Sequence, residues 1–530
     1  MVVSAPYQAA LMSGDAAAIL GAIVDLDGPY DRQVQEQLWR FLIPMNAAAN
    51  QQGENCAPVI ELLRRGAGTR NILKRILICS ALGDITGEPE WFDALFDDAG
   101  APELSFEQRH TLFVLIGTSL FRNRGKIAEA EHFRLEQVRL RALFLQLIGE
   151  MEAALAGSSF AAAPPSPAAG RVVILTPQVL APPHATTMRA LEYASSLIHD
   201  FGKTPVIVES HPFPADSPIA FVPPLLSNRN ENLRAADLIE VNGRAVEYYK
   251  VASDFFTLSD LVHTVALVSA LSPELVIAIS APYLAAEAVA LRYPTFCQPT
   301  TAASPITRRA KTFSWVPPTP ELEALMQRFG VEDPSIFHMP PGFSAPEEHP
   351  PASRAELGLP ADAFVFAVVG VRLDDDVDGR FLDLLETLTA DPRAHVAMMG
   401  RFDEFEAALA PRPALAARVT FLGYRPDILS VLRVCDAYLN PDRTGGGRSG
   451  AYALHAGLPV LSLRRGDVAG AVGPERCCAS YAEMAAEAAR LIDDPVRLAG
   501  QREDARARAR ELIGVRGLIA RILAEMNIPA

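Results

Sequence analysis

The chain of 530 residues has few cysteines, tryptophans and lysines, and it has no long apolar run. Its six cysteines form no CxxC pair and no Cys/His spacing of the zinc-site kind, which favours reduced thiols and predicts no metal site. No apolar stretch is long and charge-free enough to span a bilayer. The first residues lack a basic segment and include Asp15, so they do not resemble a signal peptide, and we expect a cytoplasmic protein.

Positive charge is also scarce, since the formal net charge is −15. Such a balance argues against nonspecific nucleic-acid binding but leaves room for a small basic pocket. All lysines lie between Lys74 and Lys311. A phosphate bound by the last third of the chain must therefore be held by arginines, backbone N–H groups or a helix N-terminus.

The pattern of apolar residues predicts three parts. Residues 1–155 carry apolar residues at helical spacing and no convincing 34-residue repeat, which predicts an all-helical domain. Small residues and prolines predict a linker over 156–170. Apolar strands then alternate with helices over 171–345 and again over 346–530. The expected fold class is α/β, with two tandem Rossmann-like domains after an all-α domain.

Individual strands are expected where short apolar runs end in turn residues. Residues 213–257 are less regular and are expected to form loops, and 482–528 are expected to be helical. The expected strands are 171–180, 204–210, 272–280 and 293–299 in the first α/β part, and 363–370, 394–400, 418–423, 437–441 and 458–463 in the second.

The stretch TGGGRSGAYALHAGLP, residues 444–459, is the leading candidate site. Gly445, Gly446 and Gly447 follow an expected strand and precede an expected helix. Glycines allow the backbone to approach a ligand closely, and a helix N-terminus favours an anion, so the pattern predicts phosphate binding. The alternative is that the three glycines only form a tight turn.

Three loops after expected strands should meet at one sheet edge beside these glycines, because ligands of open α/β sheets bind beyond the carboxyl ends of the strands. An aromatic ring and several arginines suit a nucleoside diphosphate. Alternatively, Arg372 pairs with the run Asp374–Asp376, and Tyr424 is a packed loop residue. We expect the aspartate run to be a solvated turn rather than a metal site. The loops supply Arg372; Tyr424 and Arg425; and Arg443, Thr444, Arg448 and Ser449.

In the first α/β part, His184 lies in the loop after the first expected strand and just before a helix. Two α/β domains face to face form a cleft, and a histidine there could act as a base or orient an acceptor or a phosphate across this expected cleft. The alternative is a hydrogen-bonded loop histidine. Ser280, Tyr283 and Gln298 end later strands and could line the same cleft.

The motifs GVRLDDDVDGRF, FLGYRPDILSVLRVCDAYLNP and GGGRSGAYALHAGLPVLSLRRGDV resemble nucleotide-sugar glycosyltransferases of the two-Rossmann GT-B fold, with a family-4-like C-terminal domain. The helical segment in front looks like that of cytoplasmic protein glycosyltransferases, which modify adhesins or flagellins. The resemblance implies that the C-terminal domain binds the nucleotide sugar and the N-terminal domain binds the acceptor. It also implies that the nucleotide sugar is a co-substrate and that neither a metal nor another cofactor is needed.

Residue by residue, the resemblance places Arg372 at a diphosphate-binding arginine and His184 near the reacting carbon. Tyr424 and Arg425 fall in the loop that receives the base, and residues 446–449 fall at the phosphate-binding helix start. The chain departs from the family at a pair of glutamates, which are Thr444 and Tyr452 here, and at a lysine, which is Val377. The chain therefore lacks the residues that the family uses for the ribose contact and for one phosphate contact, and it lacks the glutamate pair of many retaining members.

The resulting hypothesis is a hexosyltransferase that moves a sugar from a UDP-sugar to a protein or glycan acceptor. Two alternatives remain: a degenerate GT-B module that only binds a partner, and a nucleotide-sugar epimerase. The helical domain is expected either to have no site of its own or to contact an acceptor, a partner protein or a second copy of the chain.

Overall fold

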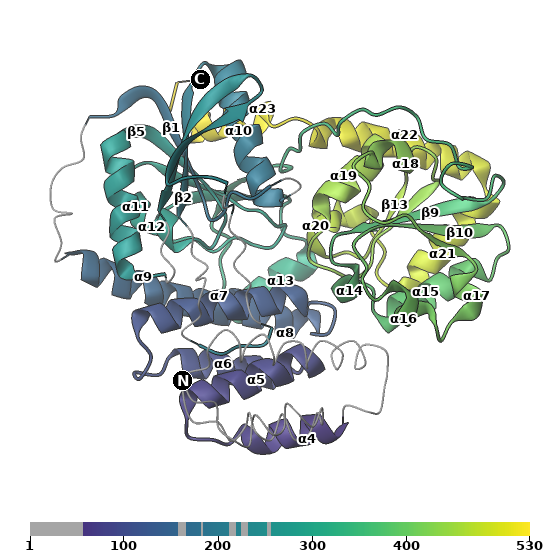
Figure 1. Ribbon diagram of the computed structural model, residues 1–530, viewed down its shortest axis with the longest axis horizontal. Helices are drawn as coiled ribbons and strands as arrows, with labels where there is room; N and C mark the ends of the chain where they lie inside the picture. The colour runs from purple at the N-terminus through teal and green to yellow at the C-terminus, as the bar shows by residue number, and fades with distance from the viewer. Residues whose placement is uncertain are drawn as a thin grey trace. The chain divides into compact units, whose positions relative to one another are not determined.

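The computed structural model describes residues 57–156, 166–181, 184–210, 219–223, 230, 232–251 and 256–529 (Figure 1). These residues form two compact units. The described part of Met1–Thr300 belongs to the first unit with Pro305–Thr312 and Glu323–Pro334. The second unit comprises Thr301–Ser304, Phe313–Leu322 and the described residues from Ser335 onward.

The first unit begins with helices, which confirms the all-helical prediction for 57–155; residues 1–56 lie outside the described residues. Local capping sets several of the helix ends. Ser105 and Gln108 form a capping box at the start of α7, and Gly87 ends α5 in the left-handed conformation. The helices are α4 (Ala57–Gly66), α5 (Ile72–Thr86), α6 (Pro89–Ala99), α7 (Phe106–Arg122), α8 (Glu129–Phe133), the π-helix η2 (Arg134–Leu140) and α9 (Arg141–Ala156).

The first sheet has the order β3-β4-β2-β1-β5-β6-β7-β8. Its central pairs are parallel, and β1, β2 and β5 are almost continuously apolar because both faces are covered. The strands are β1 (Ala168–Thr176), β2 (Thr204–Ser210), β3 (Ala236–Val241), β4 (Arg244–Val251), β5 (Pro273–Ile279), β6 (Thr295–Gln298), β7 (Lys311–Ser314) and β8 (Ser335–His338); the helices are α10 (Ala185–Phe201), α11 (Leu258–Leu271), α12 (Leu284–Ala290) and α13 (Pro320–Phe329).

The helical segment shares one hydrophobic core with the first sheet. Helix α9 packs against α12, and Leu147 and Met151 of α9 belong to the same buried cluster as Leu284 of α12 and Val276 of β5. A hydrogen bond adds to this contact, since Ser80 Oγ on α5 accepts from the backbone N–H of Val222 at 2.9 Å.

The prediction of loops over 213–257 is wrong for β3 and β4. These strands form an antiparallel hairpin across Asn242 and Gly243, which have φ values of 46° and 78°. An Asn-Gly pair suits the two positive φ angles of a tight hairpin turn, so the signal was present in the sequence. Strand β1 also begins at Ala168, within the expected linker, while 157–165 lie outside the described residues.

The second unit has an all-parallel sheet of order β11-β10-β9-β12-β13. The predicted fold class is thus confirmed. No helix in the described part of the chain has both the length and the apolar character of a membrane span. The strands are β9 (Phe364–Gly370), β10 (Ala394–Gly400), β11 (Val419–Phe421), β12 (Ala437–Leu439) and β13 (Val460–Leu461). The helices are α14 (Leu373–Asp376), α15 (Gly379–Thr389), α16 (Phe405–Leu409), α17 (Pro413–Ala416), α18 (Ile428–Leu432), α19 (Gly447–His455), α20 (Gly466–Val472), the 3-10 helix η4 (Pro474–Arg476), α21 (Tyr481–Asp493), α22 (Pro495–Leu512) and α23 (Arg516–Glu525).

Candidate functional site

The glycine loop lies where the sequence places it, between β12 and α19 on the second unit. Gly446 is the N-cap of α19 with a φ of 97°, and no side chain caps the helix. A Cβ on Gly446 would lie 2.7 Å from Arg443 Nη2, and one on Gly447 would lie 3.0 Å from Trp315 Cζ3. Packing and the positive φ therefore require a glycine at 446, and Gly447 is tightly packed, so the loop presents the positive end of a helix at the carboxyl edge of the sheet.

Buried Arg443, just before the glycines, connects this loop to the strands by hydrogen bonds. Its side chain is 4% exposed and donates hydrogen bonds to Asn440 Oδ1 at 2.9 Å and to Val369 O at 2.8 Å. It also donates to Asp376 Oδ2 at 3.1 Å and to Tyr438 Oη at 3.0 Å. Because these acceptors occupy the guanidinium, we assign Arg443 to the scaffold of the site rather than to ligand binding.

Ser449 and Thr444 are also tied into the scaffold. Ser449 Oγ donates to Gly446 O at 2.8 Å and lies 3.0 Å from Tyr438 Oη. Thr444 is buried, and its carbonyl oxygen accepts from the backbone N–H of Asp467 at 2.6 Å. The structure therefore brings both residues to the predicted place but directs the Ser449 hydroxyl inward.

Arg448 lies on the first turn of α19, half-buried against an aromatic ring. Its guanidinium carbon is 5.4 Å from the centre of the Phe343 ring. Nη1 donates to Ser344 Oγ at 3.1 Å and to Tyr452 Oη at 3.3 Å. Arg448 and Tyr452, which the sequence comparison singled out, thus contact each other.

Arg372 lies just before α14 at the end of β9, with its side chain 31% exposed. Its Nη2 is 3.9 Å from Asp376 Oδ1, at the outer limit of an ion pair. The expectation of a solvated acidic turn holds for exposed Asp375 but is wrong for Asp376, which is buried beside Arg443. Asp374 accepts from the backbone N–H groups of Asp403 and Glu404. The pairing alternative for Arg372 is therefore borne out for Asp376.

The predicted base loop follows β11. It reaches the neighbouring strand, since the N–H of Gly400 donates to Gly423 O at 2.8 Å. Tyr424 is 59% exposed, so it is not a packed loop residue. Arg425 instead donates two hydrogen bonds to Asp427, from Nε to Oδ1 at 2.8 Å and from Nη2 to Oδ2 at 2.6 Å. These bonds lower the pKa of the Asp427 carboxyl. The loop thus offers a tyrosine ring, while the guanidinium beside it is occupied.

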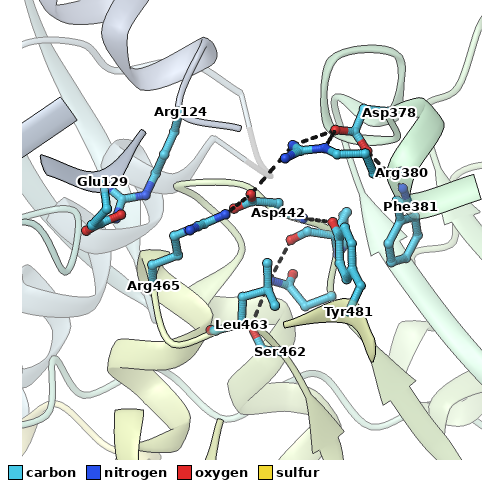
Figure 2. Close-up of polar contacts among 12 residues, drawn as sticks. Arg124, Glu129, Asp378, Arg380, Phe381, Asp442, Ser462, Leu463, Arg465 and Tyr481 are labelled. Atoms are coloured by element: carbon cyan, nitrogen blue, oxygen red, sulfur yellow. Dashed lines mark hydrogen bonds and ion pairs between the residues drawn. The ribbon is translucent and has the colours of Figure 1, made fainter. Parts of the chain in front are cut away.

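Two further arginines on this edge, Arg380 and Arg465, are not among the residues predicted from the sequence (Figure 2). Arg465, which follows β13, forks onto the buried carboxylate of Asp442. Arg380, at the start of α15, is shared between Asp378 at 2.7 Å and Asp442 at 3.7 Å, and its side chain is 52% exposed. The backbone N–H of Asp442 donates to Tyr481 Oη at 2.9 Å. The signal in the sequence was weak, because Arg380 and Arg465 are far apart in the sequence and only the fold brings both to Asp442.

On the first unit, His184 is the N-cap residue of α10. Of the other expected cleft residues, Ser280 is half-buried like His184, and two are buried. Tyr283 is buried and donates its hydroxyl to Ser210 O at 2.8 Å, and Gln298 is buried and bonded to Tyr193. Both side chains therefore serve the packing of this sheet. Among the described residues, no three or more histidines, cysteines or acids are grouped as metal ligands.

Three solved structures are similar to this chain. One is a point mutant of the Thermobaculum terrenum O-GlcNAc transferase, with a TM-score of 0.54 and 16% identity over 98% of this chain and 95% of that one. HepE from Anabaena in complex with UDP has a TM-score of 0.49 and 18% identity over 67% of this chain and 100% of its own. A glycosyltransferase from Rickettsia africae has a TM-score of 0.49 and 11% identity over 67% and 98%. No family model and no curated protein sequence matches the chain.

The likeness to the first of these structures spans the helical segment and both sheets. Together with the two Rossmann-like sheets, it shows that the chain has the GT-B fold of nucleotide-sugar glycosyltransferases, preceded by helices. The predicted resemblance is thereby confirmed at the level of fold.

Proposed function

We propose that the protein is a glycosyltransferase that moves a sugar from a nucleotide diphosphate sugar, of the UDP class, to a protein or glycan acceptor. The observation that carries the proposal is the glycine loop: an uncapped helix start that two glycines and buried Arg443 fix at the carboxyl edge of the second sheet. A helix N-terminus in that place suits a diphosphate.

Arg372 is the side chain we propose for the leaving diphosphate. It lies on the loop after β9, whose neighbour in the sheet, β12, leads into the glycine loop. During transfer the bond from the sugar carbon to the diphosphate oxygen breaks, that carbon forms a bond to the acceptor atom, and the acceptor's proton passes to the departing diphosphate. Charge then grows on the diphosphate, and fixed donors stabilise it in the transition state. Because an arginine and backbone N–H groups supply the positive charge that offsets the charge on the diphosphate, we propose a reaction that needs no metal.

The tyrosine of the base loop completes the donor site in this proposal. The Tyr424 ring is exposed, and an exposed ring gives a nucleobase a flat stacking surface. His184, on the first unit, is proposed to contact the substrate near the reacting carbon, and the helical segment is proposed to serve an acceptor or partner. A structure that matches 98% of this chain is named an O-GlcNAc transferase, which supports transfer of a sugar.

Arg372→Ala tests the assignment. We expect the variant to fold but to lose at least about a hundredfold in kcat/KM for donor consumption, because one transition-state donor is worth that much. Arg372→Lys should recover little, since lysine gives a point charge instead of a fork. Arg393→Ala is the matched control, because Arg393 is an exposed arginine just before β10, at the other end of the strands.

The same assay separates the alternatives. Normal turnover by Arg372→Ala would refute the role of Arg372. An altered free sugar from donor alone would indicate an epimerase, and failure of the native protein to bind UDP would indicate a degenerate module.

A further inference from the structure

The loop that carries His184 is held by two hydrogen bonds to its backbone. The N–H of Val179 donates to Glu209 Oε2 at 3.1 Å, and the N–H of Leu180 donates to Thr187 Oγ1 at 2.7 Å. Glu209 is itself buried and accepts from Tyr248 Oη at 2.7 Å. Thr187 thus joins the first turn of α10 to Leu180, and Glu209 holds the neighbouring Val179.

The ring of His184 turns one nitrogen toward α10. Nδ1 accepts from the backbone N–H of Thr187 at 3.3 Å, as an N-cap side chain does, and lies 2.8 Å from Thr187 Oγ1. The Thr187 hydroxyl already accepts from Leu180, which leaves its own proton free to point at Nδ1. A proton on Nδ1 would face the Thr187 N–H directly, so Nδ1 is an acceptor.

We infer that neutral His184 carries its proton on Nε2 and serves as a hydrogen-bond donor to a substrate oxygen, with Thr187 as the positioning residue, and that it does not serve as the base. This inference rests on the proposed function for its substrate, but the tautomer follows from contacts on the first unit alone. No proton moves to or from His184 in this role.

The neutral state is supported by the surroundings of the ring. Burial lowers the pKa of His184, and the N-terminus of α10 disfavours a cation at the same place. A neutral imidazole with one nitrogen fixed as acceptor has one donor left to offer.

The tautomer can be measured on the full chain. Long-range proton–nitrogen NMR spectra of the histidine-labelled protein distinguish a proton on Nε2 from one on Nδ1, and His184→Asn identifies the signals. We expect the Nε2–H form in the native protein and in Thr187→Ser, and a mixture of tautomers in Thr187→Val. A predominant Nδ1–H form in the native protein would overturn the inference, whether or not the protein transfers sugar.

A pair of substitutions tests the role in turnover. Asparagine and aspartate both cap a helix well, so both variants should fold and melt close to the native protein. His184→Asn keeps an acceptor for Thr187 and supplies an N–H donor, whereas His184→Asp keeps the acceptor and supplies none. We expect His184→Asn to stay within about tenfold of native kcat, and His184→Asp to lose about a hundredfold or more, as for a lost oxyanion donor.

The opposite order would overturn the donor role, because aspartate can act as a base and asparagine cannot. Equal activity of both variants with the native protein would overturn it too. If the native protein turns over no nucleotide sugar, the proposed function fails, and the NMR spectra still decide the tautomer.

Discussion

At the scale of single residues, burial separates arginines that the sequence leaves equivalent. Arg443 is enclosed and bonded to four acceptors, while Arg372 and Arg380 retain exposed surface on the same edge. A buried guanidinium must be paired with acceptors, which makes it part of the scaffold, whereas a partly exposed one still has surface in contact with solvent.

His110 on α7 should make the stability of the first unit sensitive to acid. Its ring stacks on Phe256 at 3.8 Å between centres, and burial lowers its pKa to about 3. In the unfolded chain the pKa of histidine is about 6.5, so the unfolded state binds the proton first as pH falls. The neutral ring therefore favours folding above about pH 6.5, and this contribution is lost progressively toward pH 3.

The measurement is the free energy of unfolding in urea at pH 7 and pH 4.5. We expect the native protein to lose about 2 to 3 kcal/mol more than His110→Phe over this interval, since each unit of pKa difference corresponds to about 1.4 kcal/mol. Equal losses in the two proteins would show that His110 takes up a proton without unfolding.

At the scale of elements, the start of α19 depends on one glycine. A Cβ at Gly446 would meet Nε, Cζ and Nη2 of Arg443 at 2.7 to 2.9 Å, and the bonds of Arg443 prevent it from moving away. The φ of 97° adds strain for any other residue. The loop should therefore shift or unfold locally when a methyl group is introduced.

Gly446→Ala should lower the free energy of unfolding by more than the strain of a positive φ, which is about 1 to 2 kcal/mol. Gly358→Ala is the control, because Gly358 has a φ of 65° with nothing within 4 Å of the added Cβ. Urea unfolding of both variants separates the cost of the positive φ, present in both, from the cost of the clash with Arg443, present only at Gly446. A loss at Gly446 no larger than at Gly358 would mean that the loop tolerates the clash.

The elements themselves could largely be predicted. The strand expected over 204–210 is β2, and the one over 394–400 is β10, because buried parallel strands are short apolar runs with clear ends. The hairpin of β3 and β4 was missed although Asn242-Gly243 marks it, since its exposed, polar strands lack an apolar run.

The candidate site could be predicted only in part. The loop at residues 445–447 could be predicted from its three glycines, because backbone conformation is a local property. The inward turn of the Ser449 hydroxyl and the pair of Arg380 with Asp442 depend on residues distant in sequence, which a single sequence does not bring together. The roles of Arg372, Arg448 and His184 in binding stay predictions.

At the scale of the whole molecule, the helices before the first sheet share its core, so they form part of one compact unit with it. The domain boundaries expected at 155 and 345 stay predictions. Helix α9 buries Leu147 and Met151 against α12. Removal of the helical segment would expose the apolar surface of α12, so functional tests should use the full chain.

The central claim is that the glycine loop and Arg372 bind the diphosphate of a nucleotide sugar. Its most direct test is a calorimetric titration of the full chain with UDP, alongside Arg372→Ala and the control Arg393→Ala. We expect binding by the native protein and by Arg393→Ala, and at least about tenfold weaker binding by Arg372→Ala, because a charged hydrogen bond is worth about 1.5 to 3 kcal/mol. No binding of UDP by the folded native protein, or equal binding by all three, would contradict it.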